Sequence, residues 1–146
     1  MKYLLIKYGE ENYWYELDDE GYAIRQIILD EHRQIHVSCL EDCLAEGPVN
    51  EEDLEGSIEN LSKREFDILW QDALKKYEKL WEEIKKRYPI GVYVQGKYGY
   101  SYPQGSIIRG NDFIAIYKGK DPFRLHQVVQ YRVKSYDDIN MWLIVE

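Results

Sequence analysis

The sequence has few of the features that mark exported or membrane-spanning proteins. Its apolar runs stay well short of the roughly 20 residues that a membrane-spanning helix needs. The start, MKYLLIKYGE, is interrupted by Lys2 and Lys7 and lacks the apolar core and the small-residue cleavage site of a signal peptide. The chain contains only two cysteines, and without an export signal both are expected to be reduced thiols. We therefore expect a cytoplasmic protein that does not contact a membrane.

Sequence signatures of common catalytic sites are also missing. The chain has no G-x-S-x-G nucleophile motif, no P-loop and no G-x-G-x-x-G fingerprint. Cys39 and His126 are residue types that can act as nucleophile and base, but the sequence identifies no third group to orient them. We expect a protein that is not an enzyme and that uses no cofactor.

Tyrosine, in contrast, is abundant. The sequence holds 14 tyrosines against three phenylalanines, and 45% of its residues are hydrophobic. This composition can bury a core, so that extensive disorder is excluded. A tyrosine ring carries a polar tip on an apolar body, which suits half-buried positions at sheet faces and binding surfaces.

Charge is distributed unevenly along the chain. The net charge is −8, which argues against general affinity for phosphate backbones. Residues 1–62 hold 4 Lys and Arg against 16 Asp and Glu, whereas residues 89–146 hold 7 against 5. We therefore expect an anionic partner to bind the C-terminal part.

The first 60 residues have the pattern of an antiparallel sheet. Runs of β-branched and aromatic residues predict strands at 2–8, 13–17, 22–29 and 34–39. The short polar segments between them permit only hairpins, so the strands form a meander. Residues 40–61 are polar and acidic, and they predict a loop with a short strand near 57–60.

A long amphipathic helix follows. Ser62 and Glu65 form a capping box, which predicts a helix that begins at Lys63. Apolar residues then recur at helical spacing as far as Tyr88, and Pro89 ends the helix. We expect this helix, residues 63–88, to join two β-modules and to cover the face of one.

The remaining residues predict five more strands. These lie at 90–98, 105–110, 112–119, 128–137 and 140–146, with a polar, partly helical insertion, DPFRLHQ, between the third and the fourth. Five strands with an insertion at that place follow the order of an OB-fold barrel.

The last part of the chain resembles a known family. The tail HQVVQYRVKSYDDINMWLIV resembles the closing hairpin of S1-type RNA-binding domains, and IGVYVQGKY is similar to their opening strand, with glycines at Gly91 and Gly96. The resemblance covers residues 90–146 and implies an OB-type barrel that binds nucleic acid. No such resemblance extends to residues 1–88.

Together these patterns predict an α+β protein in three parts. Residues 1–62 form the acidic antiparallel meander with its loop, residues 63–88 the connecting helix, and residues 89–146 the S1-like OB barrel.

The tyrosines of the predicted barrel are candidates for a binding surface. Tyr98, Tyr100 and Tyr102 alternate around the first hairpin, so their rings are expected to share one side and to stack on unpaired bases. Tyr117 is expected to extend this surface across the second and third strands. Basic residues are expected to bind the phosphates there, namely Arg109, Lys118 and Lys120, with Lys97 and Arg124 nearby. The alternative is a tyrosine-rich strand that packs on the long helix.

One group of residues has the side-chain types of a zinc site. His32, His36, Cys39 and Cys43 follow the pattern H-x3-H-x2-C-x3-C. Structural zinc sites usually separate two ligand pairs by a longer loop, which is missing here. We therefore expect no metal, and interpret these residues as buried thiols and surface histidines.

Two functions remain open. The first is a module that binds single-stranded RNA or DNA through the barrel. The second is an acidic interaction module, such as an antitoxin, an immunity-type protein or a regulator, whose N-terminal part binds a basic protein. The sequence does not determine the oligomeric state.

Overall fold

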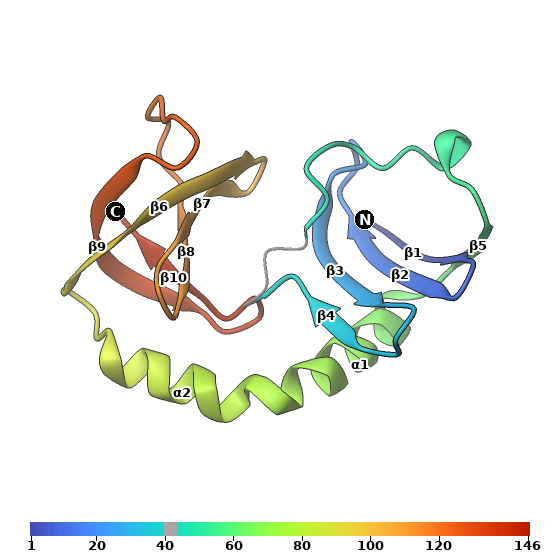
Figure 1. The fold of residues 1–146 in the computed structure, drawn as a ribbon, viewed down its shortest axis with the longest axis horizontal. Coiled ribbons are helices and arrows are strands. Elements are labelled where there is room, and N and C mark those ends of the chain that lie inside the picture. The colour runs from blue at the N-terminus through green and yellow to red at the C-terminus, as the bar shows by residue number, and fades with distance from the viewer. Residues whose placement is uncertain (40–43) are drawn as a thin grey trace. The chain divides into compact units, whose positions relative to one another are not determined.

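The computed structural model describes residues 1–39 and 44–146 and divides the chain into two compact units, Met1–Lys76 and Tyr77–Glu146 (Figure 1). The first unit contains β1 (Lys2–Tyr8), β2 (Glu11–Leu17), β3 (Ala23–Leu29), β4 (Ile35–Val37), a 3₁₀ turn (Glu51–Asp53), β5 (Ser57–Asn60) and α1 (Lys63–Leu74). The second contains α2 (Glu78–Arg87), β6 (Tyr93–Tyr102), β7 (Gly105–Arg109), β8 (Ile114–Tyr117), β9 (Val128–Asp137) and β10 (Trp142–Val145). An antiparallel N-terminal sheet, one helical stretch and a C-terminal barrel confirm the predicted α+β fold class.

The N-terminal sheet has the order β4-β3-β2-β1-β5, and each neighbouring pair is antiparallel. Short turns join the first four strands, as their spacing predicts. The fifth strand, also expected from the sequence, returns to pair with β1, where Ile58 lies opposite Ile6. The predicted meander is therefore confirmed, and β5 adds an outer strand to it.

α1 packs on this sheet with its predicted apolar side. The backbone N–H of Glu65 donates to Ser62 Oγ at 3.1 Å, and the Ser62 N–H donates to the Glu65 carboxylate at 3.4 Å, which completes the capping box. One turn apart, Phe66 and Trp70 are almost fully buried, with their rings 6.2 Å apart. Burial of this apolar side, more than intrinsic propensity, holds the helix in place.

The helical stretch is continuous from Lys63 to Arg87, as predicted, but it contains one tighter turn. Lys75–Tyr77 form a 3₁₀ turn between α1 and α2, and the boundary between the two units falls within this turn. Trp81 and Ile84 of α2 are buried within the second unit. Each half of the helix thus contributes to the core of one unit. In the part of the chain that the structure describes, no helix is long and apolar enough to span a membrane.

The second unit is a closed barrel with the strand order β10-β8-β7-β6-β9 (Figure 1). All its pairs are antiparallel except β8 with β10, which run parallel, and β9 closes the barrel by pairing with both β6 and β10. Numbered from the first barrel strand, this order is 1-2-3-5-4, which is compatible with an OB-like fold.

Aromatic side chains close the barrel near the two ends of β9. At the end of β9, the Trp81 indole of α2 donates to Asp138 at 2.8 Å and lies edge-on to Tyr136. At its beginning, Tyr131 stacks on Tyr117 of β8 with 4.2 Å between ring centroids. Phe123, from the segment between β8 and β9, contacts both of these rings and the ring of Tyr98. These half-buried rings form an aromatic cluster at one end of the barrel.

Candidate functional site

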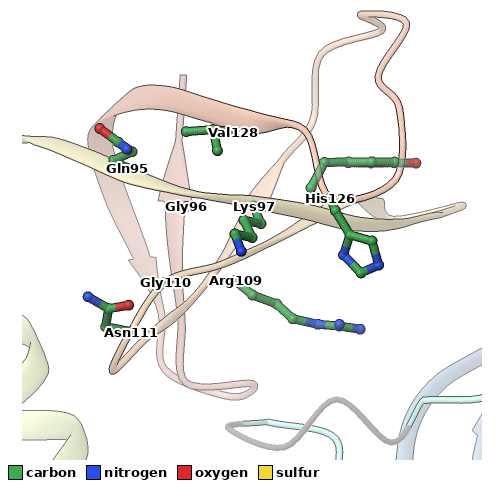
Figure 2. Close-up of a pocket in the computed structure, with 9 residues that line it drawn as sticks. Gln95, Gly96, Lys97, Arg109, Gly110, Asn111, His126 and Val128 are labelled. Carbon is green, nitrogen blue, oxygen red and sulfur yellow. The ribbon is translucent and has the colours of Figure 1, made fainter.

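A hollow of about 490 Å³ lies on the outer side of β6 (Figure 2). It is lined by residues of β6, of the turn after β7 and of the segment before β9, namely Gln95, Gly96, Lys97, Tyr98, Arg109, Gly110, Asn111, His126 and Val128. All of these belong to the C-terminal unit.

The hollow carries positive charge. Figure 2 shows the side chains of Lys97, Arg109 and His126 on the same side of β6. None of the described lining residues is acidic. Two fixed cations, an imidazole and the amides of Gln95 and Asn111 therefore form a surface suited to an anionic ligand with hydrogen-bonding groups.

A β-bulge at Gly99 brings Arg109 over the strand. The register between β6 and β7 shifts between Tyr98 and Tyr100, so Gly99 has no partner on β7. A Cβ atom at Gly99 would lie 3.2 Å from Nε of Arg109 and 3.3 Å from its guanidinium carbon. The absence of a side chain at this position lets the guanidinium lie flat against the backbone.

His126 has a left-handed backbone, with φ of 65°. Its N–H donates to the carbonyl of Tyr98 at 2.8 Å, and the Tyr98 N–H donates to the carbonyl of Gln127 at the same distance. These two bonds attach the segment before β9 to β6 and place the His126 imidazole beside the hollow. Backbone strain of this kind persists only where surrounding contacts enforce it, and it is often found at functional sites.

The conformation of His126 leads to a test of this strain. His126→Gly should raise the free energy of unfolding by about 1 kcal/mol relative to His126→Ala, because glycine adopts positive φ without a Cβ clash. The alanine variant is the matched control, since it also lacks the imidazole but keeps the strain. Chemical denaturation measures both, and equal stability of the two variants would contradict a strained backbone.

The bulge also changes how the hairpin tyrosines are placed. Alternation predicts that Tyr98, Tyr100 and Tyr102 share a side, but Tyr98 lies opposite Ile108 and Tyr100 opposite Ile107, so their side chains point to opposite faces. Tyr98 lies on the same side as Ser101, whose Oγ lies 2.5 Å from the phenol oxygen. The shared-side expectation therefore fails because Gly99 shifts the alternation by one residue.

Tyr100 and Tyr102 remain on the outer side of the hairpin, with ring centroids 5.0 Å apart. Tyr100 is half-buried, whereas only 7% of Tyr102 is exposed. Of the two rings, Tyr100 is the one that a ligand could contact.

Tyr117, predicted on the binding surface, is half-buried in an aromatic cluster at one end of the barrel. It stacks on Tyr131 nearly face to face, and its hydroxyl donates to Asp121 at 2.7 Å. The bond to Asp121 raises the pKa of Tyr117, and burial is the main cause that raises the pKa of Tyr131 to about 12. Tyr131 covers one face of this ring, so a base could stack on that face only by displacing Tyr131.

The predicted basic residues divide into two groups. Arg109 lines the hollow together with Lys97, whereas Lys118 and Lys120 are exposed on the segment after β8 and do not line it. Sequence reasoning did not predict Gln95, Asn111 or His126 as binding residues, and it considered His126 only as a possible catalytic base. A usable signal existed, because no Asp or Glu occurs in residues 84–111 or 122–136 of this acidic chain.

The four residues of zinc-ligand type are dispersed where the structure describes them. His36 Nε2 lies 2.8 Å from Asp30 Oδ2, His32 is exposed and Cys39 is fully buried, while Cys43 lies outside the described residues. Among the described residues, no group of three His, Cys, Asp or Glu is arranged to hold a metal ion.

No protein-family model matches the chain, and no curated protein matches it in sequence. The closed five-stranded barrel is compatible with an OB-like fold, and no family match supports the S1 resemblance.

Proposed function

We propose that the protein is a non-enzymatic, cytoplasmic binding protein. Its C-terminal barrel binds single-stranded RNA or DNA, with RNA as the first candidate, as S1-like domains do. The observation that carries the proposal is the hollow on the outside of β6, lined by Lys97, Arg109 and His126 without a carboxylate. Cations in a groove bind the backbone of a single strand, and amides and ring faces contact its bases.

The distribution of charge also favours the C-terminal unit as the part that binds nucleic acid. Residues 77–146 hold 11 Lys and Arg against 8 Asp and Glu, whereas residues 1–76 hold 8 against 19. The acidic unit repels a polyanion and so limits where it can bind. Binding is therefore weak and salt-sensitive, with a dissociation constant on the order of 10–100 µM.

A titration of a fluorescein-labelled twelve-nucleotide oligouridine at low salt tests the proposal. The double variant Lys97→Ala, Arg109→Ala should bind at least about tenfold more weakly. The slope of log affinity against log salt should fall by about 1.4, because each lost phosphate contact on a single strand accounts for about 0.7.

The matched control is Lys79→Ala, Lys86→Ala, which removes the same charge from exposed positions of α2. This control should keep both the affinity and the slope within about twofold of wild type. An equal loss in both double variants would mean that only net charge matters. No binding by wild type at about 100 µM would refute the nucleic-acid function.

A basic protein partner for the N-terminal unit is the second candidate. A hollow of about 520 Å³ in that unit is lined by five acidic side chains, Asp18, Asp19, Glu20, Glu51 and Glu52. This surface favours a cationic partner, in line with an antitoxin, immunity or regulatory role. It becomes the leading proposal if the oligonucleotide titration shows no binding.

A further inference from the structure

A second surface continues from the hollow along β6 and β9. These two strands lie side by side in the barrel (Figure 1). They pair in register, with Lys97 opposite Val128, Gln95 opposite Gln130 and Tyr93 opposite Arg132. All six residues are exposed, while the intervening Val94 and Val129 are buried. The six therefore share the outer face of the barrel. We call them the β6–β9 face.

Tyr93 is the most accessible ring on this face. Tyr93 is 68% exposed, far more than Tyr98, Tyr100 or Tyr102. It lies four residues before Lys97, about 13 Å along the strand. An aromatic ring held on a rigid strand and left open to solvent can stack on a base of any type.

The rest of the β6–β9 face has matching chemistry. Gln95 and Gln130 pair between the positions of Lys97 and Tyr93, and their amides can donate to and accept from base edges. Lys134 is exposed at the next outward position of β9, while Arg132 pairs with Glu146 at 2.9 Å. Neither β6 nor the stretch of β9 up to Tyr136 contains an acidic residue.

The more usual OB binding face, across the second and third barrel strands β7 and β8, presents fewer exposed groups to a ligand here. Its outer positions in the middle of β7 and β8 are Ile107 and Ile116, and each is only 2% exposed. A single strand bound in the hollow therefore meets exposed polar and aromatic groups along β6 and β9, and not across β7 and β8.

We propose that the β6–β9 face is a second subsite for single-stranded nucleic acid. The strand leaves the hollow past Gln95 and Gln130, and one of its bases stacks on Tyr93. This inference rests on the proposed function, because it extends the same bound strand. The shared residues Gln95, Lys97 and Val128 make the hollow and the face one continuous track.

Oligouridines of two and twelve nucleotides separate the two subsites. Wild type should bind the longer one more tightly, because a dinucleotide is too short to span the roughly 13 Å from Lys97 to Tyr93. Tyr93→Ala should weaken binding of the twelve-nucleotide strand by at least about fivefold and leave the dinucleotide unaffected. The Lys97→Ala, Arg109→Ala variant should weaken both.

Two controls identify stacking as the cause. Tyr93→Phe keeps the ring and should bind like wild type, and Tyr8→Ala removes an exposed tyrosine from the N-terminal unit and should have no effect. If wild type binds the longer strand but Tyr93→Ala binds it equally well, the second subsite is refuted and the hollow stands. If Tyr93→Phe is as weak as Tyr93→Ala, stacking is refuted. If wild type binds neither strand, the proposed function itself fails.

Discussion

Replacing Arg25 with methionine should lower the free energy of unfolding by about 3–5 kcal/mol. Arg25 donates to both carboxylate oxygens of Glu16, at 2.8 and 2.9 Å, and to Asp67 of α1 at 2.7 Å. The side chains of Arg25 and Glu16 are 9% and 7% exposed. Methionine fills a similar volume but leaves the Glu16 carboxylate buried without its partner.

The double variant Arg25→Met, Glu16→Gln is the control for this prediction. It removes the buried charge together with its partner, so it should recover part of the lost stability. Urea denaturation of the three proteins measures the difference. If the double variant is as unstable as Arg25→Met, the loss comes from packing against Phe66 and Trp70 and not from an unpaired charge.

The effect of Arg25→Met should also depend on pH. Hydrogen bonds from Lys63 and then Arg25 hold the pKa of Asp67 below its usual 3.8. A lowered carboxyl pKa stabilises the fold above the unfolded value and loses that contribution as the pH falls through the folded value. The stability gap between wild type and variant should therefore narrow below about pH 4, and a constant gap would contradict the contact with Asp67.

Trp81→Ala should destabilise the C-terminal unit by about 3–5 kcal/mol. Trp81 is nearly fully buried, its indole donates to Asp138, and its ring lies 6.0 Å from Tyr136 and 5.5 Å from the Lys85 ammonium. Removing the indole opens a cavity where α2 meets the end of the barrel. Thermal unfolding measures the loss.

Trp81→Phe separates the hydrogen bond from the packing. It keeps an aromatic ring, so it should cost less than the alanine change. The bond from Trp81 is the main cause that lowers the pKa of Asp138, with Lys85 adding to it. An NMR titration should therefore find the pKa of Asp138 moved toward 3.8 in both variants, and an unchanged value would contradict the bond.

The sequence predicts most of the fold because local signals agree with the tertiary arrangement. The Ser62–Glu65 capping box and Pro89 delimit the helical stretch, and β9 has the bounds that alternation predicts. β6 differs, since it extends to Tyr102 instead of ending at residue 98. The bulge at Gly99 lets the strand continue past a glycine that looks like a turn residue.

The candidate site was only partly predictable, for physical reasons. Arg109 and Lys97 are predictable from their charge. His126 reaches β6 only because its own backbone is left-handed, and a histidine in the sequence gives no sign of that conformation. Tyrosine suits buried and exposed positions alike, so composition could not separate Tyr117, which stacks on Tyr131, from Tyr93, which is open to solvent. The pairing of β6 with β9 supplies that distinction.

The open N-terminal sheet and the closed barrel carry different risks of self-association. The barrel has no edge strand, whereas the sheet ends at β4 and β5. Both edges are short, with three and four residues, and β5 places Glu59 at its centre. A second chain could add few backbone hydrogen bonds there and would have to bury a charge. The short length of both edge strands and the charge of Glu59 on β5 therefore disfavour aggregation through the sheet edges.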